Sequence, residues 1–147
     1  MSKVESIENL LQAWLNMSIC IRGNRILKNM SFNEILICNI LYRHQDEETI
    51  TATDLCCRTR LLKSQINKIL SEMEKRNLIE RVRSDKDKRK VFIRLKPESI
   101  PVYRKEHEKI LDILNVVYDE MGNEKVNSLT EFLNEALSIV DRVQKQI

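Results

Sequence analysis

The chain has 147 residues, of which 42% are hydrophobic and 32% charged, with two glycines and two prolines. This length suits one domain with helical extensions, and so few turn-forming residues exclude an all-β fold. The longest apolar runs span only a few residues, so we expect no membrane span, and no basic stretch leads into an apolar one as an export signal would. A cytoplasmic chain is therefore expected, with its four cysteines reduced: Cys20, Cys38, Cys56 and Cys57.

Positive charge is concentrated in the centre of the chain. The net charge is +3, but residues 58–94 contain thirteen Lys or Arg against five Asp or Glu, a local charge of +8 that leaves −5 elsewhere. A basic centre between acidic flanks predicts that one surface meets a polyanion while the other surfaces avoid it.

The first helix is predicted from apolar residues at helical spacing. These residues run from Val4 to Leu15, so the helix is expected to reach about Cys20. Gly23 and Asn24 form a dipeptide that is typical of a turn.

Two capping boxes predict the starts of the next two helices. Ser31 precedes Glu34 by three residues, and Thr51 precedes Asp54 by three. The first box leads into an apolar run that is typical of a buried helix. The second leads into a short helix, which a tight turn near Arg60 should end.

The segment KSQINKILSEMEKRN predicts a longer helix with one apolar face, which consists of Ile66, Ile69, Leu70 and Met73. Asn77 marks its end, because asparagine tolerates the left-handed conformation better than other non-glycine residues. The segments LIERVR and KVFIRL alternate apolar and polar residues, which predicts a β-hairpin with RSDKDKRK as its loop.

Two apolar stripes predict two long helices at the C-terminal side. One stripe runs from Ile110 to Met121, and the other from Val126 to Val143. Between them, Gly122 is expected to end the first helix and Asn123 to cap the second.

These elements predict a mainly α fold with a small β-hairpin wing. Residues 31–97 would form a winged helix-turn-helix DNA-binding domain, and residues 1–30 and 98–147 a helical dimerisation region. The terminal helices carry more apolar surface than a winged helix can cover, which favours a homodimer over an intramolecular three-helix bundle.

The middle segment has the chemistry of a double-stranded DNA reader. A helix that exposes Lys, Ser, Gln and Asn in its first turns can lie in the major groove, where amide side chains read adenine edges. The cationic hairpin loop can follow the phosphate backbone and insert an arginine into the minor groove. The competing interpretation of such a charge run is a solvated hairpin tip.

The stretch ATDLCCRTRLLKSQINKILSEMEKRNLIERVRSDKDKRKVFIRL resembles the winged helix-turn-helix of the MarR family of bacterial transcription regulators. NLIERVRSDKDKRKVFIRL is similar to the wing motif of that family, and the order of flanking helices also matches. The resemblance implies a dimer on a pseudo-palindromic operator, acting as a repressor that a small molecule could release. It also implies roles for individual residues: Arg89 in the minor groove, oriented by Asp87; Lys86, Lys88 and Lys90 along the backbone; Lys63, Ser64, Gln65, Asn67 and Lys68 in the major groove; and Thr53 and Arg58 near phosphates.

Three positions depart from the family pattern. Asn77 stands where the family has glycine, and the turn at Thr59–Leu61 contains no glycine, so one backbone position there is expected to be strained. The segment LKPES replaces the usual Leu-Thr-x-x-Gly, so the chain should enter the next helix differently.

Other chemistries have weaker support in the sequence. Cys20, followed by Arg22, is the candidate thiol for a redox-sensing regulator, whereas Cys56 and Cys57 are adjacent on a helix and diverge too far to form a disulfide. Two histidines without close cysteines do not predict a zinc site, and no motif predicts an enzyme or a cofactor. The alternative from another class is a helical protein-interaction module that docks an acidic partner on its winged helix.

Overall fold

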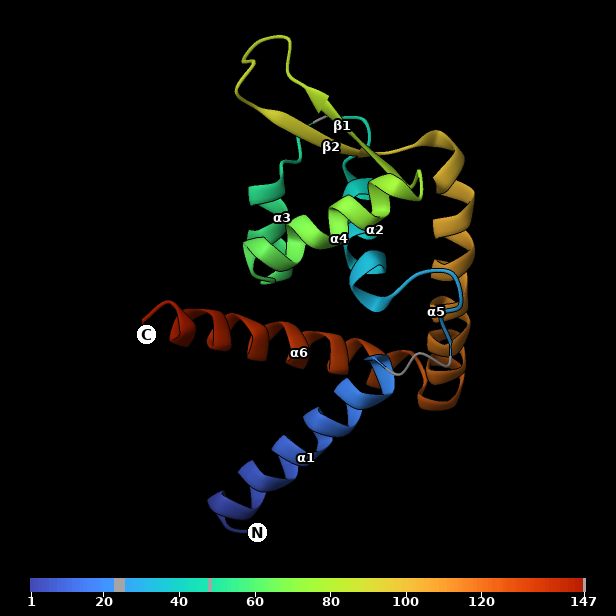
Figure 1. Ribbon diagram of the computed structural model, residues 1–147. Coiled ribbons are helices and arrows are strands. Elements are labelled where there is room, and N and C mark those ends of the chain that lie inside the picture. Colours follow the sequence, from blue (N-terminus) through green and yellow to red (C-terminus); the bar gives the residue numbers. More distant parts are fainter. Residues whose placement is uncertain (23–25, 48, 147) are drawn as a thin grey trace. The chain divides into compact units, whose positions relative to one another are not determined.

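The computed structural model describes residues 1–22, 26–47 and 49–146, so the turn predicted at Gly23 and Asn24 lies outside the described residues. The chain divides into two compact units, residues 1–107 and residues 108–147. In chain order (Figure 1) the elements are α1 (Lys3–Arg22), α2 (Phe32–Arg43), α3 (Ala52–Thr59), α4 (Lys63–Lys75), β1 (Ile79–Arg83), β2 (Val91–Leu95), the 3-10 helix η1 (Pro97–Ser99), α5 (Ile100–Met121) and α6 (Asn123–Gln144). The predicted mainly helical fold with one hairpin is confirmed.

The two predicted capping boxes are both present. Ser31 and Glu34 bond reciprocally at the start of α2, and Thr51 and Asp54 do the same at the start of α3. Each box satisfies two backbone N–H groups that an uncapped helix would leave without partners. The helices therefore begin where local sequence dictates.

The two predicted strands pair antiparallel in one register. Ile79 faces Leu95 at one end of the hairpin, and Arg83 faces Val91 at the other. Ile93 also donates its N–H to the carbonyl of Ile50 at 2.8 Å, which ties the segment before α3 to β2. The hairpin is thereby fastened to the helical part of its unit (Figure 1).

Among the described residues, two non-glycine residues adopt the left-handed conformation, one at Asn77 as predicted and one in the glycine-free turn at Thr59–Leu61 where strain was expected. Arg60 ends α3 with φ 61°, and Asn77 follows α4 with φ 59°.

Pro97 begins the short 3-10 helix η1, so the chain enters α5 by the altered route expected from LKPES. One detail is wrong: α6 has Gly122 as its N-cap, with φ 87°, and Asn123 is its first helical residue.

The core lies in the first unit and gathers the apolar faces of α2, α3, α4 and the hairpin. From the predicted inner face of α4, Ile66, Leu70 and Met73 are fully buried, whereas Ile69 is half-buried. Packing from neighbouring elements adds Ile37, Cys38, Leu55 and Ile79, all of them 0% exposed.

The long helices at the two ends of the chain differ from this core. All residues of α1 and α6 are described, and none of them is buried; in α5 the buried residues are Tyr103 and Glu106. Apolar side chains are exposed along all three helices, Trp14 and Phe132 among the largest of them. Within the described residues, these and all other helices are too short or too polar to cross a membrane.

Candidate nucleic-acid interface

The first two turns of α4 present a polar face to solvent. Sequence periodicity places its apolar residues inward, and the five residues predicted to face the major groove are all exposed: Lys63, Ser64, Gln65, Asn67 and Lys68. The buried Ile66 and Leu70 fix the rotation of the helix, so this polar face is set by the core beneath it.

Gln65 has a structural task that the sequence did not reveal. The N-cap of α4 is Leu62, whose side chain accepts no hydrogen bond, and Gln65 Oε1 instead accepts the Leu62 N–H at 3.0 Å. Reading an adenine edge with both ends of a glutamine amide requires that same oxygen. Asn67, one residue past Ile66, is therefore the better-placed amide for base reading.

The hairpin loop organises itself through short-range hydrogen bonds. Ser84 donates its N–H to the Lys90 carbonyl at 3.0 Å, and its hydroxyl accepts the N–H groups of Lys86 and Asp87 at 3.3 and 3.2 Å. Lys90 in turn donates its N–H to the Asp87 carbonyl at 2.9 Å. A charged loop without glycine thus closes because a serine hydroxyl and backbone groups satisfy its turn.

Arg89 extends from this loop into solvent. Its backbone N–H donates to Asp87 Oδ1 at 3.1 Å, and its side-chain Nε lies 3.3 Å from the same oxygen. The Arg89 side chain is 93% exposed although one of its nitrogens is held by this carboxylate. Asp87 therefore restricts the direction of the guanidinium and leaves its outer nitrogens accessible, which is the pairing that the family resemblance implied.

Arg58 on α3 is exposed but held by a neighbour from the end of α2. Its Nη1 donates to His44 Nε2 at 3.0 Å, and His44 Nδ1 lies 3.1 Å from Glu47 Oε2. Because arginine only donates, His44 Nε2 must carry a lone pair, so its proton sits on Nδ1 and points to Glu47. Sequence spacing does not predict the hydrogen bond between Arg58 and His44, because these two residues lie fourteen positions apart. Thr53, in the first turn of α3, is exposed as well.

A guanidinium just after α4 fastens this helix to the segment before α2. Arg76 Nη1 contacts Glu34 Oε2 at 2.5 Å, and Arg76 Nη2 donates to the Asn29 carbonyl at 2.6 Å. The fully buried Glu106 accepts the Lys28 N–H at 3.2 Å and the Asn29 side-chain amide at 3.3 Å. This network holds the far end of α4, and only the Glu34 capping box in it was visible from sequence.

All four cysteines are free. Cys20 and Cys57 are exposed, whereas Cys38, on the inner side of α2, is buried in the core, as its apolar surroundings predicted. Burial raises the pKa of the Cys38 thiol to about 12, with a further rise from the carboxylate of Glu34. Among the described residues, no group of three metal-ligating side chains could hold a metal ion.

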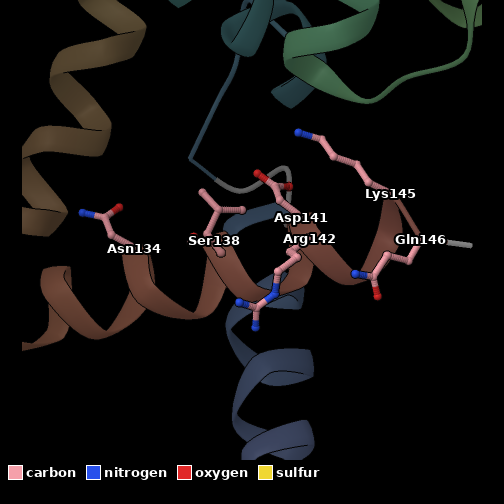
Figure 2. Close-up of a pocket in the computed structure, with 7 residues that line it drawn as sticks. Asn134, Ser138, Asp141, Arg142, Lys145 and Gln146 are labelled. Carbon is pink, nitrogen blue, oxygen red and sulfur yellow. The ribbon is translucent and has the colours of Figure 1, made fainter.

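A surface hollow of about 600 Å³ lies along the C-terminal half of α6 (Figure 2). Asp141, Arg142 and Lys145 supply its charges, and the whole lining comes from this helix and the two residues after it. Ligand sites usually lie between elements and gather polar groups from several of them. We therefore assign no ligand to this hollow.

Comparisons with known proteins agree with this geometry. The sequence pattern of the family described as transcriptional regulator SarA/Rot matches residues 24–113. The HTH-type transcriptional regulator FarR of Neisseria gonorrhoeae is 27% identical over 93 residues, which make up 63% of this chain and 64% of FarR. The chain thus matches slightly less than two thirds of the length of this relative.

Two solved structures share nearly the whole fold. The transcriptional regulator BldR from Sulfolobus solfataricus aligns over 94% of this chain and 99% of its own, with a TM-score of 0.74 and 26% identity. Streptococcus pneumoniae FabT, solved in complex with DNA, aligns over 96% of this chain and 99% of its own, with a TM-score of 0.69 and 18% identity.

Proposed function

Because this chain belongs to the SarA/Rot family of transcriptional regulators, we propose that it is a dimeric, sequence-specific DNA-binding repressor that acts in the cytoplasm. The resemblance to the MarR family is confirmed by the matching family and by the fold of the solved relatives. The observation that carries the proposal is the exposed Arg89, which Asp87 holds in a basic wing loop, together with the exposed polar face of α4.

In this proposal α4 enters the major groove. Lys63 meets phosphate near the entry of the helix, aided by the positive end of the helix dipole, while Ser64 and Asn67 face base edges. The buried inner face of α4 supports the assignment, since it leaves the polar side as the surface that can face a groove.

The wing and α3 would grip the backbone on either side. Arg89 enters the minor groove, where the potential is most negative, while Lys86, Lys88 and Lys90 lie along the phosphates. Thr53 and Arg58 approach the phosphates next to α3. Each neutralised phosphate releases counterions, so binding should weaken steeply as salt rises.

Dimerisation supplies the second half of the operator contact. Exposed apolar residues run along each of α1, α5 and α6, and extensive apolar exposure usually marks a protein–protein contact. Two copies related by a two-fold axis would place two α4 helices on successive turns of a pseudo-palindromic site. A small-molecule effector, which the resemblance implies, stays a prediction.

The experiment that tests this function is a titration of labelled operator DNA, selected from genomic fragments, at about 50 mM and about 200 mM salt. With six to ten phosphate contacts, affinity should fall about 10³- to 10⁵-fold between these two conditions. Lys63→Ala and Arg89→Ala should each weaken binding about tenfold or more, and each should reduce the salt slope by about one for every phosphate that it leaves without a cation.

Lys75→Ala is the matched control, because Lys75 is an exposed lysine at the opposite end of the same helix. It should leave both affinity and salt slope unchanged. Affinity that ignores salt, or that survives the Lys63→Ala and Arg89→Ala changes together, would contradict the proposal. In that case a chain that still captures acidic proteins would favour the interaction module.

A further inference from the structure

Leu62 stands out among the apolar side chains of the winged helix. It is 68% exposed, and within residues 31–47 and 49–97 every other large apolar side chain is buried or half-buried. Comparable exposure occurs in α1, α5 and α6, where a second subunit is proposed to cover it. Leu62 lies at the start of α4, where no subunit contact is proposed.

Leu62 also occupies a position where leucine is a poor choice. It is the N-cap of α4, with extended φ −67° and ψ 150°, a place where Ser, Thr, Asp or Asn would bond the free N–H groups of the first turn. Gln65 partly replaces the missing cap by accepting the Leu62 N–H at 3.0 Å. A residue that neither packs nor caps breaks a local rule, and such departures concentrate at functional positions.

The neighbours of Leu62 indicate what its side chain meets. Lys63 and Ser64 follow it directly and are exposed, and Asn67 lies on the next turn. In the proposed docking this first turn approaches the base edges of the major groove. The apolar group presented there is the C5-methyl of thymine, because the remaining major-groove edges display hydrogen-bond donors and acceptors.

We propose that Leu62 is a specificity-determining residue that contacts the C5-methyl group of a thymine in each half-site. The inference rests on the proposed function and adds a base preference to it. Asn67 would read a neighbouring base by hydrogen bonds, while Leu62 favours thymine at its own position by burying the methyl group.

The test replaces each thymine of the selected operator in turn by deoxyuridine, which lacks only the C5-methyl. With the full-length protein, a replacement in one half-site should weaken binding about fourfold, the value for one buried methyl-sized group, and the symmetric pair about fifteenfold. Leu62→Ala should bind the unmodified operator about fifteenfold more weakly and no longer distinguish thymine from deoxyuridine at this position.

Leu62→Asn is the second variant, because asparagine is a better N-cap and should keep the helix folded. It should lose the methyl preference in the same way while its thermal stability is kept or increased. Lys75→Ala serves again as the control, since Lys75 is exposed at the opposite end of α4, outside the proposed DNA and subunit surfaces. It should retain the full preference.

Three results would overturn the inference. The wild-type protein could bind the operator yet respond to no deoxyuridine replacement, or both Leu62 variants could keep the preference. Leu62→Ala could also lower the affinities for the thymine duplex and the deoxyuridine duplex by the same factor, so that their ratio stays as in the wild-type protein. A wild-type chain that binds no duplex at about 50 mM salt would instead refute the proposed function, and this inference with it.

Discussion

Leu70 on α4 and Leu133 on α6 are the same side chain on two helices that each carry an apolar stripe, yet they are 0% and 61% exposed. Leu70 packs among residues of the winged helix, which fills its own core. Leu133 belongs to a helix in which no described residue is buried. The same periodic pattern therefore has two outcomes: in the winged helix it builds a core, and in the long helices it leaves apolar residues exposed, which the proposed second subunit would cover.

The largest expected effect comes from placing a charge in the exposed stripe. Leu133→Glu should convert a dimer into a monomer, because it puts a carboxylate into an apolar subunit contact. Operator affinity should then fall about 100-fold or more, since the two half-sites no longer act as one linked contact. Analytical ultracentrifugation and operator titration measure the two effects.

Asn134→Glu, which adds the same charge at an exposed polar position of α6, is the control for this change. It should leave the dimer and its operator affinity intact. A Leu133→Glu protein that remains dimeric would show that the stripe of α6 has another use.

A second test exchanges the same two leucines for alanine. Leu70→Ala should lower the free energy of unfolding by about 2–5 kcal/mol, because it leaves a cavity in a packed core. Leu133→Ala should change the unfolding of the monomer by less than about 0.5 kcal/mol, as is usual for exposed positions. Urea unfolding at two protein concentrations separates the two cases, because only the destabilisation by Leu133→Ala should depend on concentration. Equal destabilisation at both sites would remove the distinction between the two regions.

A smaller effect concerns the end of α4. Asn77→Ala should cost about 1–2 kcal/mol of stability relative to Asn77→Gly, because alanine with a positive φ brings its Cβ against the backbone. Both changes remove the hydrogen bond between Asn77 Oδ1 and Lys96 Nζ at 3.3 Å, so their difference isolates the backbone effect. Thermal unfolding of the two variants measures it, and equal melting temperatures would contradict a strained position.

The smallest effect is chemical, since it leaves the folded chain intact. In the native protein a thiol reagent should modify Cys20 and Cys57, and should reach Cys38 only after unfolding. Because burial holds the pKa of Cys38 near 12, above the ordinary value of 9.0, this thiol contributes stability that is complete below about pH 9 and is lost as pH rises toward 12. Mass spectrometry of labelled peptides identifies the modified residues. Rapid labelling of Cys38 in the native chain would contradict its burial.

Local signals made much of the winged helix predictable. The Ser31 and Thr51 capping boxes, the alternation of the two strands and the left-handed Asn77 each depend on residues within a few positions of one another. Ser2 and Glu5 form a further reciprocal pair at the start of α1, bonded at 2.7 and 3.2 Å, which the same rule would have found.

The candidate site was predictable only in part. Exposure of the α4 and wing residues followed from periodicity, but the hydrogen bond of Arg58 with His44 and that of Arg76 with Glu34 join different helices. Tertiary packing brings such partners together, so their spacing along the chain does not predict the hydrogen bond. The hydrogen bond from the Leu62 N–H to Gln65 Oε1 was not predicted, because a leucine at the N-cap does not indicate that a later side chain will accept its N–H.

The wing loop closes on itself before anything binds to it. Ser84, Asp87 and Lys90 hold one another through hydrogen bonds of 2.9–3.2 Å, and Arg89 is already directed by Asp87. Little conformational entropy remains to be lost at the moment of encounter, so the wing needs no slow ordering step before it engages a duplex. We therefore expect association at electrostatically steered rates of about 10⁸ M⁻¹s⁻¹ at low ionic strength, with differences between operators expressed mainly in how long each complex lasts.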